Sequence, residues 1–343
     1  MTSGRHAILL DVDTGIDDSL ALLYACGSPE AELVAVTCLA GNVAGELVEE
    51  NTRAVLELAG RGDVEVSLGA EVPLVRPLVV TPETHGPRGI GHATLPPPRR
   101  PRSARHGADV IVELARSRPG EIELVTLGPL TNLAIALERE PELPRLLRRW
   151  VLMGGAYGAP GNTTPTAEWN IHVDPDAAKL AFAGWARAID ADATIPRALA
   201  MGLDVTERAR LLPDRVEAIA AAATAATPGG GSAEPARPNR VVRFLEDALR
   251  FYFEFHDRFD GFYGAFIHDP LVVAATLDPS LVETVPSFVD VETTGELTTG
   301  TTIADRRGHR GRRPNVDLAV EADAEEFLRR LVARVGALAA AVG

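Results

Sequence analysis

The chain has 343 residues, enough to bury a large hydrophobic core in one large domain or two ordinary ones. Its formal net charge of -14 argues against a nucleic-acid-binding surface, and no apolar stretch is long enough to span a membrane. The two cysteines form no disulfide framework and the apolar N-terminal stretch is too short for a signal peptide, so we expect a cytoplasmic protein.

The first structured segment is an apolar run that ends in a cluster of acids. Residues 8–12 predict a buried strand, Gly15 predicts a turn, and residues 19–27 carry apolar side chains at helical spacing. Four aspartates occur within eight positions of this corner, namely Asp11, Asp13, Asp17 and Asp18. The acids therefore lie at a strand–turn–helix corner, the place where open α/β sheets bind ligands.

Two interpretations of this acidic cluster compete. Four neighbouring carboxylates repel one another, and a bound cation that prefers oxygen ligands would neutralise them. Alternatively, acids in the first turn of a helix stabilise its exposed amides, which explains Asp17 and Asp18. Helix capping does not explain Asp11 and Asp13, which lie on or directly after the strand, so the pattern favours a metal site.

Apolar strands then alternate with helices through the first half of the chain. We expect strands at residues 33–39, 64–68, 122–127 and 150–153, and helices at 45–60, 109–116, from 131 and from 176. This alternation predicts an α/β fold: an open, mostly parallel sheet with helices on both faces. Polar residues follow several of the strands at their carboxyl ends.

The second half of the chain departs from this rhythm. A strand and a helix start are expected at residues 201–206, a strong helix at 241–259, and a closing helix at 322–341. The aromatic residues along helix 241–259 are interpreted as core or subunit interface. Residues 287–320 predict a small antiparallel extension at the sheet edge. Because no repeat or clean linker is present, we expect one domain over residues 1–343.

Two segments fit no regular element. Residues 81–107 are rich in glycine, proline and arginine and predict a long surface loop, which in compact domains is often a lid. Its glycine spacing matches no familiar phosphate-binding loop. His85, taken alone, is expected to be a solvated residue of this loop. Residues 224–239 are low in complexity and predict a flexible excursion.

Taken together, the motifs resemble the inosine–uridine-preferring nucleoside hydrolases, which remove the base from ribonucleosides. The aspartate-rich block resembles the signature of that family, and six further blocks follow in the order of the family, so the resemblance covers nearly the whole chain. The seven blocks are residues 11–18, 40–42, 85–86, 127–132, 153–155, 162–170 and 268–270. The resemblance implies a Rossmann-like nucleoside hydrolase fold with a small antiparallel β extension.

The resemblance also implies a calcium ion at the strand ends. Its ligands in this chain would be Asp13, Asp18, the backbone carbonyl of Leu127, and Asp269. These are oxygen atoms only, which suits Ca²⁺ and not zinc. The 2′- and 3′-hydroxyls of the ribose and a water would complete the coordination.

Further roles follow from the matching motif positions. Asp13 would also be the general base that activates the metal-bound water, and Asp11 would orient the loop and its acids. The residues matching those that hold the 2′- and 3′-hydroxyls are Asp17, Asn42, Asn170 and Asp269, and those near the 5′-hydroxyl are Asn162 and Glu168. Attack on the face opposite the base should invert the anomeric carbon.

The base must also leave and be recognised. His268 matches the histidine proposed to protonate purine bases, and His85 matches a lid position that closes over the nucleoside. The low-complexity segment 224–239 and the Pro/Arg-rich stretch after Gly91 fall where the base-binding wall is expected. The preferred base and the physiological pathway, in nucleoside catabolism or purine and pyrimidine salvage, are left open. By likeness to the family we expect a homodimer or homotetramer.

Two other functions compete with a calcium-dependent ribonucleoside hydrolase. A haloacid-dehalogenase-like phosphatase also has a strand ending in Asp-x-Asp, but its pattern continues Gly-Thr, whereas this chain has Thr14-Gly15 and two further aspartates. A catalytically silent protein that binds calcium and nucleoside would be expected to lack the general base, yet Asp13 is present. Hydrolysis of the N-glycosidic bond is therefore the leading hypothesis.

Overall fold

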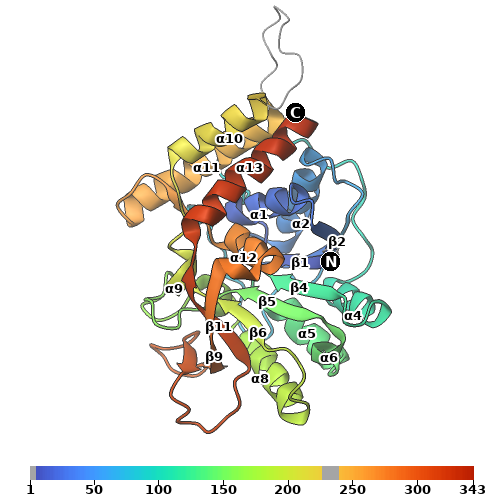
Figure 1. Cartoon of the computed structure of the whole chain (residues 1–343), viewed down its shortest axis with the longest axis vertical. Helices are drawn as coiled ribbons and strands as arrows, with labels where there is room; N and C mark the ends of the chain where they lie inside the picture. Colours follow the sequence, from blue (N-terminus) through green and yellow to red (C-terminus); the bar gives the residue numbers. More distant parts are fainter. Residues whose placement is uncertain (1–4, 226–238) are drawn as a thin grey trace, which may run out of the picture.

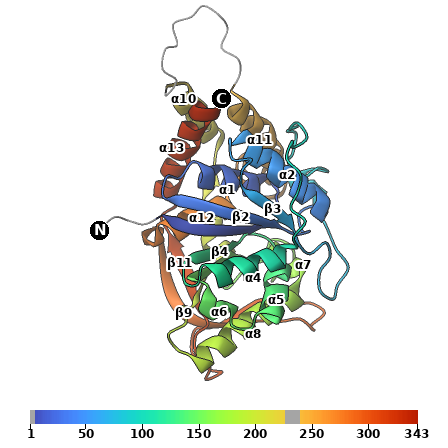
Figure 2. The same ribbon diagram turned by 90° about the vertical axis from the view of Figure 1, so that its right-hand side faces the viewer.

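A computed structural model describes residues 5–225 and 239–343 (Figures 1 and 2). The predicted excursion at 224–239 lies almost entirely outside the described residues. In the described part of the chain, a central sheet contains nine strands in the order β10-β9-β11-β6-β5-β4-β1-β2-β3. Its strands are β1 (His6–Val12), β2 (Ala31–Cys38), β3 (Glu65–Leu68), β4 (Ile122–Thr126), β5 (Arg149–Met153), β6 (Ala198–Met201), β9 (Val282–Val291), β10 (Thr302–Asp305) and β11 (Val316–Ala322).

The strand directions confirm the predicted mostly parallel sheet. All neighbours from β3 across to β11 pair in parallel, whereas β9 pairs antiparallel with both β11 and β10 at the edge. A separate antiparallel pair joins β7 (Arg210–Leu211) to β8 (Ala265–Phe266). The strand order reverses between β1 and β4, so a topological switch point, the usual ligand site of such sheets, lies at their carboxyl ends.

Helices cover both faces of the sheet (Figures 1 and 2). The main helices on one face are α1 (Ile16–Cys26), α2 (Gly45–Leu58), α10 (Pro213–Ala225), α11 (Arg240–Phe259), α12 (His268–Leu277) and α13 (Ala324–Val342). Those on the other are α4 (Gly107–Ser117), α5 (Thr131–Arg139), α6 (Leu143–Leu146) and α8 (Pro175–Ala191). Shorter helical turns are α3 (Pro82–His85), α7 (Trp169–Val173), α9 (Leu203–Thr206) and η1 (Pro279–Leu281).

Alternation along the strands builds two hydrophobic cores. In β1, Ile8 and Leu10 face the core under α1 and α12, while Leu9 faces the opposite core with Trp150 of β5 and Trp185 of α8. All five side chains are almost fully buried. Burial on both faces explains why the parallel strands appear in the sequence as nearly continuous apolar runs.

The predicted elements of the first half are confirmed, with shifts of a few residues at their ends. Helix α1 begins at Ile16, three residues before the predicted start, because Gly15 already serves as its N-cap. The closing helix and the antiparallel strands are also present. Strand β6 begins at Ala198 instead of the predicted residue 201, and α10 was not predicted. No helix among the described residues combines the length and apolarity needed to cross a membrane.

Candidate active site

The predicted site residues converge at the switch point of the sheet. Asp11 and Asp13 lie at the end of β1, and Leu127 directly follows β4, where its amide donates to the carbonyl of Asp11 at 2.8 Å. Asp11 turns toward its neighbours: its Oδ1 accepts from Thr37 Oγ1 at 2.6 Å and from Asn132 Nδ2 at 2.8 Å. These bonds fix the loop after β1 and leave Asp13 as the aspartate at the strand end that lines the cavity.

Asp13 occupies a cradle made by two glycines. Its Oδ2 accepts from the backbone amide of Asn42 at 2.8 Å, and its Oδ1 is buried without a hydrogen-bond partner among the described residues. A Cβ on Gly128 would lie 2.8 Å from Oδ1, and a Cβ on Gly41 would overlap Oδ2. Both positions therefore need glycine so that the carboxylate can lie against the backbone.

This cradle gives a first prediction. Gly41→Ala is expected to displace Asp13 and lower kcat roughly 100-fold, because small misplacements of a reacting group are costly. Gly154→Ala is a matched control at the end of β5, where the added Cβ would meet Ile171 at an ordinary 3.4 Å. Steady-state kinetics of the two variants test the cradle, and equal activity in both would contradict it.

Three further acids come from the first turns of two helices that pack together. Asp17 and Asp18 begin α1, and Asp269 begins α12. One ligand oxygen from each of these three lies within 4.8 Å of the others. The Oδ2 of Asp18 accepts from the amide of Gly15 at 2.8 Å and from Asn42 Nδ2 at 3.3 Å, while its Oδ1 is buried without a partner among the described residues.

Burial and mutual repulsion raise the pKa values of these acids. Burial, and after it the charge of Asp18, raises the pKa of Asp17 to about 8. The same two causes raise the pKa of Asp13 well above its ordinary range. For Asp269, burial and then Asp17 and Asp18 raise the pKa strongly. The pKa of Asp18 rises less, to about 6, because backbone amides partly offset its burial. Such a cluster can stay ionised at neutral pH only when a positive charge compensates it.

The donor set fits an oxygen-preferring divalent cation. The partnerless Oδ1 atoms of Asp13 and Asp18 are buried acceptors, which are costly to leave unpaired. The carbonyl of Leu127 accepts from Asn170 Nδ2 at 2.6 Å and keeps a second lone pair. Carboxylates and a carbonyl, with no thiolate or imidazole, suit a hard cation.

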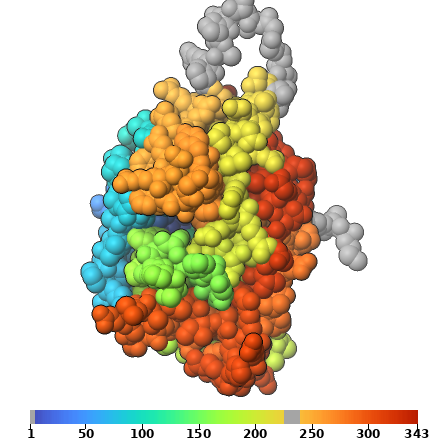
Figure 3. Space-filling view, turned by 90° about the vertical axis from the view of Figure 1, so that its left-hand side faces the viewer, coloured from blue at the N-terminus to red at the C-terminus, as the bar shows by residue number. Residues whose placement is uncertain are grey.

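A cavity of about 670 Å³ opens above these residues. In Figure 3 its mouth lies between the orange segment of α11, the green segment that follows β5 and the cyan segment that follows β3, with blue N-terminal atoms visible in the hollow. The cavity is lined by all of the predicted site residues except Asp18. These are nine residues and Leu127, namely Asp13, Asp17, Asn42, His85, Asn162, Glu168, Asn170, His268, Asp269 and Leu127. Asp18 lies behind its neighbours and is fully buried.

The loop between β5 and α7 supplies one wall of the cavity. Glu168 caps α7, accepting from the amides of Asn170 at 2.8 Å and Ile171 at 3.1 Å, and from Gly155 at 2.9 Å. Asn162 is exposed at the cavity mouth, where its Oδ1 accepts from the amide of Trp169 at 3.0 Å. Polar groups of this wall are thus held by the backbone before any ligand binds.

His85 differs from the sequence-based expectation. The prediction of a solvated loop residue is wrong: His85 is buried at the end of α3, a turn of helix inside the segment expected to lack regular structure. Its Nδ1 accepts from the amide of Ile16 at 3.1 Å, and burial lowers its pKa to about 3. His268 is also buried, bonds Thr206 Oγ1 through Nδ1 at 2.8 Å, and has its pKa lowered to about 3 by burial.

The aromatic stripe of α11 was assigned to the core or an interface, and this is only partly right. Phe244 and Phe253 are core residues, but Tyr252, Phe255 and Phe259 line the cavity together with His256 and Asp260. Helical periodicity shows which face of a helix is apolar and cannot distinguish a core from a cavity wall. Glu207, after α9, also lines the cavity and was not predicted.

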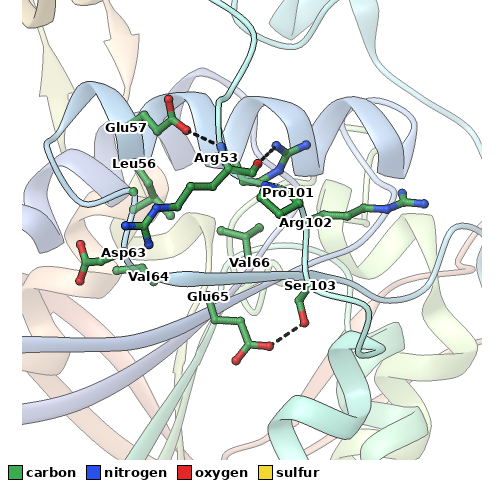
Figure 4. Close-up of a pocket in the computed structure, with 12 residues that line it drawn as sticks. Arg53, Leu56, Glu57, Asp63, Val64, Glu65, Val66, Pro101, Arg102 and Ser103 are labelled. Atoms are coloured by element: carbon green, nitrogen blue, oxygen red, sulfur yellow. Dashed lines mark hydrogen bonds between the residues drawn. The ribbon is translucent and has the colours of Figure 1, made fainter.

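The Pro/Arg-rich stretch does not form the expected base-binding wall. It packs against α2 and β3, away from the cavity: Arg53 donates to the carbonyl of Arg100 at 2.7 Å, and Ser103 Oγ donates to Glu65 at 2.7 Å (Figure 4). The residues of that segment that reach the cavity are 81 and 83–85. Of the segment predicted to be a lid, the turn around α3 is therefore the part that reaches the cavity.

Comparisons with known proteins identify the class of protein. The family described as "Inosine-uridine preferring nucleoside hydrolase" matches residues 8–329. The pyrimidine-specific ribonucleoside hydrolase RihA of Enterobacter sp. (strain 638) is 37% identical over 329 residues, which cover 96% of this chain and 97% of that protein. RihA of Citrobacter koseri is 36% identical over the same length.

Solved structures lead to the same class of protein. A purine-preferring ribonucleoside hydrolase from Gardnerella vaginalis superposes with a TM-score of 0.86 at 30% identity, covering 98% of this chain and 99% of that one. The plant nucleoside hydrolase PpNRh1 superposes with a TM-score of 0.85 at 29% identity, covering 97% and 99%. Fold and sequence thus define an enzyme that hydrolyses nucleosides. The chain belongs to the inosine–uridine-preferring nucleoside hydrolase family and is a ribonucleoside hydrolase.

Proposed function

We propose that this enzyme is a calcium-dependent ribonucleoside hydrolase with a preference for pyrimidine bases. The observation that carries the calcium site is the buried group of Asp17, Asp18 and Asp269, whose oxygens lie within 4.8 Å of one another. It is joined by the Oδ1 atoms of Asp13 and Asp18, which are buried without a partner among the described residues. A divalent ion held there by Asp13, Asp18, Asp269 and the Leu127 carbonyl would orient the ribose diol and acidify a water.

The residues around this cluster have complementary roles in the reaction. Asp13 takes the proton of the attacking water as general base. The side chains of Asp17, Asn42, Asn170 and Asp269 hold the 2′- and 3′-hydroxyls, while Asn162 and Glu168 hold the 5′-hydroxyl. Departure of the base builds positive charge on the sugar ring, and the fixed carboxylates stabilise it. Water attacks opposite the base and inverts the anomeric carbon.

The departing base interacts with the histidines. We assign His268 the role of proton donor to purine leaving groups, and His85 the role of a lid residue that closes over the nucleoside. Thr206 Oγ1 lies 2.8 Å from His268 Nδ1 and 3.2 Å from the carbonyl of Gly202. When the hydroxyl donates to Nδ1, the proton of neutral His268 is on Nε2, from which it can form a hydrogen bond to the departing base.

This assignment predicts a selective defect. His268→Ala is expected to slow inosine hydrolysis about tenfold or more relative to uridine hydrolysis, because a purine leaving group can take a proton at its imidazole ring. His92→Ala is the control, since His92 does not line the cavity and pairs with Glu254 at the surface. Slowing of both nucleosides by the same factor would remove His268 as a purine-specific acid.

The preference for pyrimidines rests on the curated relatives, two of which are 36–37% identical and are described as pyrimidine-specific. The test is a panel of uridine, cytidine, inosine and adenosine, with release of reducing sugar as the readout in the presence of calcium. Uridine and cytidine should react fastest. Faster turnover of inosine would overturn the preference, and no ribose from any of the four would favour the silent binding protein instead.

We expect a homodimer or homotetramer in the cytoplasm, by likeness to the family. Light scattering of the purified protein tests the assembly.

A further inference from the structure

His256 is a buried polar residue in the cavity that no step of the proposed reaction uses. It lies near the end of α11, is 4% exposed and lines the cavity beside Tyr252 and Phe255. Its Nδ1 lies 2.7 Å from Oδ2 of Asp260, one helical turn further along. Its Nε2 is buried and has no hydrogen-bond partner among the described residues.

The contact with Asp260 fixes which nitrogen carries the proton. A carboxylate can only accept a hydrogen bond, so Nδ1 of His256 must be the donor. In the neutral ring Nε2 then holds a lone pair and is an acceptor. A buried acceptor without a donor is unfavourable. Nε2 is therefore suited to a donor that arrives with the ligand.

The other two histidines of the cavity wall are held differently. Nδ1 of His85 accepts from a backbone amide, so the proton of its neutral ring must be on Nε2, which is a donor. Nδ1 of His268 contacts a hydroxyl that can either donate or accept. Among these three cavity-lining histidines, only His256 is fixed as an acceptor by a carboxylate.

The surroundings of His256 indicate the chemistry of the donor. Aromatic rings enclose it, with centroids at 4.7 Å for Tyr252, 5.3 Å for Phe255 and 5.1 Å for Phe266. All three of these rings also line the cavity. A wall of this kind favours a flat ring over a hydrated, flexible group. The suitable donor is an N–H on the edge of a planar heterocycle, and the N3–H of uracil is such a group.

We propose that His256, oriented by Asp260, is a specificity residue whose Nε2 accepts the N3–H of a uracil base. The inference rests on the proposed function, because it assumes that the base of the nucleoside occupies this part of the cavity. Asp260 acts through His256 and is a positioning residue. The pair reads this edge of a pyrimidine base, where uracil offers its N3–H and cytosine offers the N–H of its 4-amino group. The acids at the strand ends act on the sugar irrespective of the base.

The test compares uridine with the riboside of pyrimidin-2-one, which lacks the N3–H and the 4-oxo group and adds no bulk. His256→Phe keeps an aromatic ring and removes the acceptor, and it is expected to lower kcat/KM for uridine roughly 10- to 100-fold. The same variant should change kcat/KM for the pyrimidin-2-one riboside less than about threefold. Dividing variant by wild type for each substrate cancels the different reactivities of the two bases.

Two more variants keep the test decisive if His256→Phe folds poorly. His256→Gln retains an acceptor oxygen and should recover part of the uridine activity. Asp260→Asn leaves His256 in place but no longer holds its proton on Nδ1. The kcat/KM for uridine should therefore again fall more than that for the pyrimidin-2-one riboside. Equal losses on both substrates in all variants would overturn the specificity role. Failure of the wild-type enzyme to release ribose from any nucleoside would instead contradict the proposed function itself.

Discussion

Asp13→Asn is expected to lower kcat by about 10²–10⁴-fold, the usual contribution of a general acid or base. The asparagine has nearly the same shape, so it still fits between Gly41 and Gly128, and its side-chain oxygen can still accept from the amide of Asn42. What is lost is the capacity of the side chain to take a proton from water. The measurement is the single-turnover rate with uridine at saturating calcium.

Asp11→Asn is the matched control for this prediction. Asp11 lies two residues earlier at the end of the same strand and is equally buried, but it does not line the cavity. An asparagine oxygen can accept from Thr37 and Asn132 as the carboxylate does. We expect the rate of this variant to stay within tenfold of wild type. Near-normal turnover of Asp13→Asn, or an equal loss in the Asp11 control, would reject Asp13 as the base.

The sheet and one half of the site were predictable because they are local in sequence. An apolar run followed by aspartates and a turn predicts Asp13, Asp17 and Asp18 at one strand end, and the alternation of strands and helices predicts the parallel sheet. Asp269 lies some 250 residues away. No periodicity in the sequence predicts that Asp269 lies beside Asp18, and only the resemblance to a family predicted it. In the structure, the packing of α12 against α1 brings the two acids together.

The parts that were wrong or missed depend on tertiary contacts. His85 appeared solvated because a glycine-rich loop gives no burial signal, yet the turn of α3 packs against α11 and buries it. The Pro/Arg-rich stretch was assigned to the base-binding wall, but its backbone is tied to Glu57 of α2. His256 was missed because a histidine within an aromatic stripe is not distinguishable from a core residue until the cavity is known.

The second large effect is expected on the stability of the folded protein, which a rise in pH should lower and a bound cation should raise. Burial raises the pKa of Asp11 to about 7, that of Asp17 to about 8 and that of Asp18 to about 6 in the folded protein, from an ordinary value of 3.8. Between about pH 4 and these values, the folded chain binds more protons than the unfolded chain. The free energy of unfolding should therefore fall as pH rises through this range.

Thermal unfolding in EGTA is thus expected to show a Tm several degrees higher at pH 5 than at pH 8. Calcium should raise Tm most at pH 8, because a cation that binds only the folded state stabilises it and compensates the ionised carboxylates. Asp17→Asn should flatten the pH dependence in EGTA, since it removes the group with the highest of the three pKa values. A Tm in EGTA that rises from pH 5 to pH 8 would contradict a cation site in this cluster. So would a Tm at pH 8 that is the same with calcium as with EGTA. The two results are separable from catalysis, so they test the buried acids even in a variant that has lost turnover.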